Sequence, residues 1–205
     1  MKTIDRKNFY GRYPFRPLKQ SQIDSLNFLL DKLDASVLLT RLSEYAYVLA
    51  TLKLETADTF APVKEAYWIK PESRRIAVLK KMYAGRQSII HPSGRLYYGR
   101  GYVQLTHIDN YIKMNSYVEK QFPDYSANGG LVENPDLACE PDTAWIILEV
   151  GISKGLFTGK KLSDYFDDKK QNFYNARKII NGLDRAGLVQ AYAEKYWGVL
   201  GFEES

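Results

Sequence analysis

Apolar residues recur every three or four positions along most of this chain of 205 residues, which is the spacing of one face of an α-helix. The spacing is clearest in the segment 37–56, where a helix is expected from about Val37 to Thr56. Its apolar row is Leu38, Leu42, Tyr45, Leu49 and Leu52. The strict alternation of a β-strand is nearly absent, and only the segment 96–105 could pair as a short hairpin. The sequence therefore predicts a mainly α fold with at most a short β-hairpin.

Start signals place further helices along the chain. Ser and Thr with an acidic residue three positions later have the spacing of a capping box, proline suits a first helical turn, and aspartate suits an N-cap. The residues expected to begin helices on these grounds are Ser21, Pro71, Thr106, Pro141 and Asp184. Shorter helices are expected at 162–166 and 173–181, and the glycine-containing segment 85–101 is expected to be a loop.

The domain organisation is predicted to be simple, because the chain has no repeat, linker or low-complexity tract. We expect one domain over residues 1–205, compact or bilobed, with a basic N-terminal arm at 1–20 and a helical core at 21–200. No stretch approaches the ~18 apolar residues that span a bilayer, and the N-terminus lacks the apolar region of a secretory signal. A lone cysteine, Cys139, favours folding in a reducing cytoplasm. The net charge of +5 favours a polyanionic partner.

Carboxylates are the best candidates for catalysis. Two histidines and one cysteine are a poor supply of ligands for a catalytic zinc site, and no phosphate-binding glycine motif is present. Glu55 continues the apolar row of its helix and is expected in the last helical turn. Partial burial and the helix dipole would both favour its protonated form, as a general acid requires, although a surface glutamate at a frayed helix end fits the position equally well.

Glu65 follows ten residues later and would lie about 15 Å from Glu55 on one continuous helix. Pro62 breaks that helix, so the chain can fold back and bring the second carboxylate toward the first. Two carboxylates about 6.5–9.5 Å apart are the equipment of an inverting glycosidase, in which one protonates the leaving oxygen and the other activates water.

The segment Tyr97–Tyr111, YYGRGYVQLTHIDNY, is the most specific feature of the sequence. Its two glycines allow close backbone approach, and Arg100 suits the centre of a salt-bridge cluster. Gln104, Thr106 and Asn110 bring uncharged hydrogen-bonding groups together. Thr106 has two interpretations, a helix N-cap and a hydroxyl that holds a water molecule, and the two are compatible.

At this segment the sequence resembles glycoside hydrolase family 19, the family of plant-type chitinases and related phage and prophage endolysins. YYGRGYVQLT is similar to its glycine–arginine–glycine, glutamine–leucine–serine/threonine motif. The segment of the family that carries the catalytic acid resembles LATLKLETADTFAPVKEAY. Later segments of the bacterial and phage branch resemble ENPDLACEPDTAWIILEVGISKGLFTGKKLSDYF and ARKIINGLDRA. The opening of that branch resembles FRPLKQSQIDSLNFLLDKL. The collinear match covers about residues 9 to 200.

The resemblance implies a lysozyme-like, two-lobed helical fold and single-displacement hydrolysis without a metal or other cofactor. It matches Glu55 to the general acid, Glu65 to the general base and Thr106 to the residue that orients the attacking water. The positions that it matches to substrate binding are Tyr98, Arg100, Gln104, Asn110, Tyr111 and Asn181, with a structural role as the alternative for Arg100.

Three departures from the family pattern matter. Leu54 stands where many members have histidine before the acid. The stretch between the two carboxylates is short, so Asp58 and Glu72 remain alternatives to Glu65 as the base. The disulfides and chitin-binding domain of plant enzymes are missing, which favours the phage-like branch.

These features together predict a peptidoglycan-cleaving endolysin, or lysozyme, of a phage or prophage. We expect a monomer that neither binds nucleic acid nor inserts into membranes, made in the host bacterial cytoplasm and reaching the cell wall after the membrane is permeabilised; a virion-associated role is the alternative. A chitinase is the nearest other enzyme, and a non-catalytic glycan-binding relative is the alternative from another class.

Overall fold

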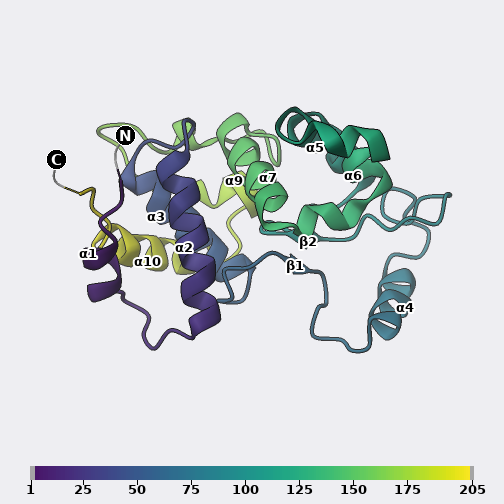
Figure 1. Cartoon of the computed structure of the whole chain (residues 1–205), viewed down its shortest axis with the longest axis horizontal. Coiled ribbons are helices and arrows are strands. Elements are labelled where there is room, and N and C mark those ends of the chain that lie inside the picture. Colours follow the sequence, from purple (N-terminus) through teal and green to yellow (C-terminus); the bar gives the residue numbers. More distant parts are fainter. Residues whose placement is uncertain (1–2, 204–205) are drawn as a thin grey trace. The chain divides into compact units, whose positions relative to one another are not determined.

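The computed structural model describes residues 3–203, which form a mainly α structure, as the sequence predicted (Figure 1). The chain divides into two compact units. Unit 1 combines the N-terminal part, up to Phe60, with the C-terminal part from Glu149, and unit 2 is the intervening segment Ala61–Leu148. None of the described helices is both long enough and apolar enough to cross a membrane.

The elements of unit 1 come from both ends of the chain. They are α1 (Arg6–Gly11), α2 (Gln20–Ala35), α3 (Leu42–Glu55), the 3-10 turn η3 (Leu162–Asp164), α8 (Phe173–Ala176), α9 (Lys178–Asn181) and α10 (Ala186–Trp197). Those of unit 2 are β1 (Val63–Lys64), α4 (Glu72–Met82), β2 (Arg100–Gly101), α5 (Ile108–Gln121), η1 (Pro123–Asn128), α6 (Gly130–Glu133) and η2 (Pro135–Cys139). Helix α7 (Pro141–Lys154) begins in unit 2 and ends in unit 1.

Helix α3 is the centre of unit 1. Every residue from Ser43 to Lys53 is buried, and the helix packs along α10 (Figure 1). The segment 1–20, expected to be a basic arm, contributes α1 and part of the core, because Ile4 and Phe9 are completely buried. The ring of Phe9 stacks on that of Tyr196, so the two ends of the chain share one aromatic cluster.

The prediction that the second helix starts at Val37 was wrong, because α3 begins at Leu42. The hydroxyl group of Ser36 accepts a hydrogen bond from the Leu39 amide at 2.9 Å, which fixes a turn after α2. The Glu44 carboxylate then accepts from the Thr40 and Arg41 amides and closes the first turn of α3. Val37 is therefore 84% exposed.

Unit 2 contains a short antiparallel pair with a different partner from the one expected. Val63 lies opposite Gly101 and Lys64 opposite Arg100, so β2 pairs with β1. Of the hairpin expected over 96–105, only an isolated bridge between Arg100 and Leu105 forms. Gly101 has φ of +83°, and a Cβ atom there would lie 2.6 Å from the carbonyl oxygen of Ala138. Both facts require glycine.

Two helix starts near the termini also differ from expectation. Helix α10 has Arg185, with φ of +54°, at its N-cap in place of Asp184. Helix α2 begins one residue before Ser21, and the Gln22 side chain accepts from the Lys19 amide at 2.9 Å. The helix expected over 173–181 is divided at Arg177, which ends α8 and precedes α9.

Candidate active site

Glu55 is the last residue of α3, and its carboxylate is held by an arginine. Its Oε1 atom accepts a hydrogen bond from Nη1 of Arg177 at 2.5 Å, and the Glu55 side chain keeps 17% of its exposure. Arg177 is almost fully buried and also donates from Nε to the Asp184 carbonyl oxygen at 2.8 Å. The carboxylate is therefore paired with a buried cation, which the expectation from burial and the helix dipole did not include. It is oriented while it stays partly accessible, so it is not a frayed surface residue.

Arg177 was not predicted from the sequence to be a site residue, although it lies four residues before Asn181. The Asn181 amide donates to the Arg177 carbonyl oxygen at 3.0 Å, which links the two residues across α9. Asn181 itself is exposed at the C-terminus of that helix. A buried arginine needs an anion or several carbonyl groups as partners. The segment that contains Asn181 therefore also contains a cation, Arg177, for which a carboxylate partner could have been sought in the sequence.

The turn after Glu55 is tightly constrained. The Thr56 hydroxyl group donates to the Leu52 carbonyl oxygen at 2.7 Å and accepts from the Phe60 amide at 2.9 Å. Ala57, Asp58 and Phe60 all have positive φ, which is unfavourable for residues other than glycine. Such strained backbone conformations persist only where the surrounding structure enforces them.

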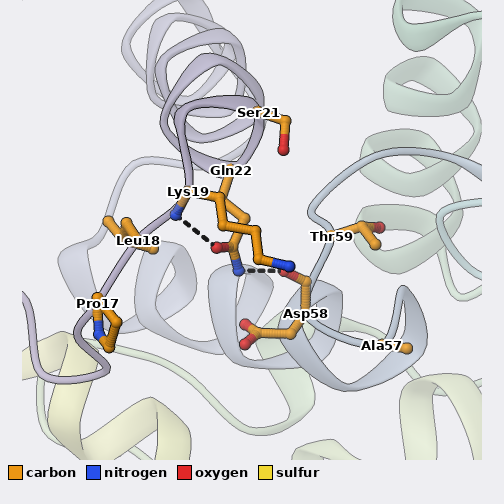
Figure 2. A pocket seen from close by; sticks show the side chains of 8 residues that line it. All are labelled: Pro17, Leu18, Lys19, Ser21, Gln22, Ala57, Asp58 and Thr59. Atoms are coloured by element: carbon orange, nitrogen blue, oxygen red, sulfur yellow. Dashed lines mark hydrogen bonds between the residues drawn. The ribbon is translucent and has the colours of Figure 1, made fainter.

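Asp58, one alternative to Glu65 as the base, has a structural partner. Its Oδ1 atom lies 2.6 Å from the amine of Lys53, a side chain only 8% exposed whose Nζ lies 4.3 Å from the centre of the Phe15 ring. Asp58 also lines a cavity of about 450 Å³ at the start of α2, where Gln22 donates to its carbonyl oxygen (Figure 2). These contacts give Asp58 a structural role, in which its carboxylate neutralises the buried amine of Lys53.

Glu65 lies just after β1 in unit 2 and is held by two donors. Oε1 accepts from the Tyr83 hydroxyl group at 2.6 Å, and Oε2 accepts from the Gly99 amide at 2.8 Å. The Glu65 amide in turn donates to the Gly99 carbonyl oxygen at 2.8 Å. Burial, with the hydrogen bond and charge of Glu65, raises the pKa of Tyr83 to about 12, so the phenol stays protonated as a donor.

The Gln104 side chain packs closely against Gly99. A Cβ atom at Gly99 would lie 2.7 Å from Oε1 of Gln104. The Gln104 amide donates from Nε2 to the Val63 carbonyl oxygen at 3.0 Å, and its backbone has φ of +52°. Gln104 thus connects the glycine motif to the strand that leads into Glu65, which gives it at least a supporting role.

Thr106 is not the N-cap of α5, and that interpretation was wrong. His107, with φ of +68°, occupies the N-cap position without a side-chain cap. The Thr106 hydroxyl group donates to the Tyr97 carbonyl oxygen at 3.0 Å, and the Asn110 side chain donates to the Thr106 carbonyl oxygen at 2.8 Å. Because a hydroxyl oxygen that donates can also accept, Thr106 keeps the capacity to bind a water molecule.

Tyr98, Arg100 and Tyr111 form a buried cluster in unit 2. The Arg100 guanidinium group lies 3.6 Å from the centre of the Tyr98 ring, and Nη1 is 3.2 Å from the Tyr111 hydroxyl oxygen. All three side chains are at most 5% exposed. Their burial favours a supporting role, which was the structural alternative for Arg100, and substrate contact by these three residues stays a prediction.

Arg100 is neutralised by Asp136. Nε of Arg100 donates to Oδ1 at 2.6 Å, and the amine of Lys64 donates to Oδ2 at 2.6 Å. Burial alone would raise the pKa of Asp136, but the hydrogen bonds and charges of Lys64 and Arg100 outweigh it and lower that pKa below its ordinary value.

Asp136→Asn is expected to reduce the free energy of unfolding at pH 7 by about 1–2 kcal/mol, less than for a fully buried pair because the carboxylate is half exposed. The stabilisation needs the ionised carboxylate, so it is complete above about pH 4 and is lost as the pH falls through the lowered pKa. Urea unfolding at pH 7 and pH 3 measures it, with Asp124→Asn as the exposed control. A difference between Asp136→Asn and wild type that is as large at pH 3 as at pH 7 contradicts this role.

Glu72, the other alternative base, is also ion-paired. Its carboxylate contacts the Arg75 guanidinium group closely and lies 3.5 Å from the amine of Lys64.

Among the described residues there is no cluster of three or more His, Cys, Asp or Glu side chains arranged to hold a metal ion. Comparison of the sequence with protein-family models and with curated proteins gives no match.

Proposed function

We propose that this protein is a peptidoglycan hydrolase that cleaves the β-1,4 glycosidic bonds of the glycan backbone by an inverting mechanism with two carboxylates. One observation carries the proposal. Glu55 and Glu65, chosen from the sequence, are each oriented by charged or hydrogen-bonding partners, Arg177 for the first and Tyr83 with Gly99 for the second. Preorganised carboxylates that stay partly accessible are what general acid–base catalysis requires.

In this mechanism Glu55 donates a proton to the leaving glycosidic oxygen, and Arg177 stabilises the carboxylate that remains. Glu65 accepts a proton from the attacking water, which Thr106 orients through its hydroxyl oxygen. The Tyr83 and Gly99 donors fix the direction of the Glu65 carboxylate, so it does not reorganise during proton transfer. Water attacks from the face opposite the leaving group, and the anomeric configuration inverts.

The resemblance to family 19 endolysins and the net charge of +5 support an anionic wall polymer as the substrate. In the proposal the enzyme is made in the cytoplasm of an infected bacterium and reaches the wall once the membrane is permeabilised.

The direct test is incubation of the purified protein with peptidoglycan and, separately, with chitin oligomers, followed by mass spectrometry of the new reducing ends. We expect new reducing ends from peptidoglycan, and proton NMR of the fresh product should show the inverted anomer. Cleavage of chitin alone would make the protein a chitinase. Binding of either glycan without any new reducing end would indicate a non-catalytic relative and would overturn the hydrolase proposal.

Thr106 gives a prediction within this mechanism. Thr106→Ser should retain most activity, because the hydroxyl group is kept. Thr106→Ala and Thr106→Val lose the hydrogen bond to the Tyr97 carbonyl oxygen, which should reduce the free energy of unfolding by about 0.5–1.5 kcal/mol. Both variants should also lose activity at least about tenfold. Rates are compared well below each melting temperature and divided by the folded fraction. Wild-type rates for the Ala and Val variants would reduce Thr106 to a structural residue.

A further inference from the structure

A second cavity, of about 350 Å³, lies in unit 2 beside the segment that carries Glu65. It is lined by Pro62, Val63, Lys64, Tyr67, Ile69, Lys70, Glu72 and Arg75. The lining combines an apolar and aromatic part with three cationic side chains and a single carboxylate. The Glu65 side chain is directed to Tyr83 and Gly99 and is not part of the lining.

The charges of this cavity leave a positive excess. Glu72 is already paired with Arg75 and, at 3.5 Å, with Lys64, which itself donates to Asp136 at 2.6 Å. Lys70 is exposed, and within residues 3–203 no carboxylate oxygen lies within 4.0 Å of its amine. The formal charge of the lining is two units positive, and Lys70 is its uncompensated member.

Arg75 gives the cavity a fixed cationic wall. Its side chain is 5% exposed, and Nη2 lies 3.3 Å from the Tyr98 hydroxyl oxygen. Nη1 lies 3.5 Å from the carbonyl oxygen of Glu65. The same arginine therefore borders the cavity and contacts the backbone of the proposed base, which places the cavity beside the segment that carries Glu65.

Trp68 adjoins the cavity through Tyr67, which is one of the residues that line it. The ring of Tyr67 lies edge-on to that of Trp68 with 5.5 Å between the ring centres, and Trp68 is 71% exposed. A tryptophan exposed to this extent presents a large apolar face to solvent, which is typical of a binding surface. Flat aromatic faces also fit the apolar face of a sugar ring.

We propose that this cavity binds the carboxylate-bearing branch of muramic acid and so selects peptidoglycan over chitin. The identity of the glycan rests on the proposed function. Each muramic acid of peptidoglycan carries a lactyl group, either as a free carboxylate or extended by an acidic peptide, whereas chitin is uncharged. Lys70 contributes the mobile cation and Arg75 the fixed one, and Trp68 contacts sugar rings that both polymers share.

The test measures binding to the Glu55→Gln protein, which prevents turnover, by isothermal calorimetry or NMR titration. Three probes are used: a disaccharide with its peptide, the same disaccharide after amidase has removed the peptide, and an N-acetylglucosamine tetramer. Lys70→Glu should weaken binding of the carboxylate-bearing probes about tenfold, as expected for a lost charge-assisted hydrogen bond, and binding of the tetramer less than about twofold. Whichever disaccharide shows the larger loss identifies the free lactyl group or the peptide as the source of the carboxylate.

Lys113→Glu is the matched control, since it makes the same charge change at an exposed position of α5 in the same unit. Its effect should stay below about twofold for every probe, whereas Trp68→Ala should weaken all three alike. The inference is overturned if Lys70→Glu and Lys113→Glu weaken binding equally, or if Lys70→Glu weakens binding of the tetramer as much as that of the disaccharides. It is also overturned if Lys70→Glu weakens no binding at all, or if neither disaccharide binds. Failure of the wild-type protein to cut peptidoglycan overturns the hydrolase proposal separately, because the binding measurement does not need turnover.

Discussion

Glu55→Gln is expected to reduce peptidoglycan hydrolysis by about 10²–10⁴-fold, the usual contribution of a positioned general acid. Glutamine keeps the shape of the side chain and its hydrogen-bonding oxygen, but it has no proton to give to the leaving oxygen. The amide oxygen can still accept from Arg177, so the geometry at the end of α3 should be preserved. Release of reducing ends, divided by the folded fraction, measures the effect.

The structure adds a cost in stability that the sequence did not indicate. Arg177 is almost fully buried and would lose its counter-charge, so Glu55→Gln should also lower the melting temperature. The Arg177 bond to the Asp184 carbonyl oxygen remains and limits that loss. Glu194→Gln, the same change at an exposed position of α10, is the control and should match wild type in rate and stability. A folded Glu55→Gln protein that lyses walls at the wild-type rate rules out Glu55 as the acid.

Glu65→Gln is expected to be nearly as inactive, again by about 10²–10⁴-fold, because an amide cannot take a proton from water. Folding should tolerate the change. The amide oxygen can keep the bond from the Gly99 amide, and the new amino group can face Tyr83, whose hydroxyl oxygen can accept as well as donate. The loss should therefore fall on the rate and leave the melting temperature nearly unchanged.

Asp58→Asn separates the base from its nearest alternative. Asp58 neutralises the buried amine of Lys53, so its loss should destabilise unit 1, while the rate per folded molecule should stay close to wild type. If Glu65→Gln remains active and either Asp58→Asn or Glu72→Gln becomes inactive, the base is misassigned while the two-carboxylate mechanism stands.

The sequence by itself determined the helical character of the chain. Rows of apolar residues at intervals of three and four, together with Pro71 and Pro141, located α4, α7 and the C-terminal end of α3, because helix periodicity and start signals are local properties. Position alone left Glu55 open between an acid and a surface residue, and the resemblance to family 19 selected Glu55 and Glu65 as the predicted acid and base.

Only the tertiary structure decided what holds those carboxylates. Arg177 lies 122 positions from Glu55, and Gly99 lies 34 positions from Glu65. The pairing of β1 with β2 and the bond from Thr106 to Tyr97 likewise depend on contacts that no local pattern specifies. Thr106 shows the difference clearly, because capping-box spacing is only one of two ways to satisfy its hydroxyl group. A local pattern limits which hydrogen bonds a residue can make, and the packing of distant segments determines which of them forms.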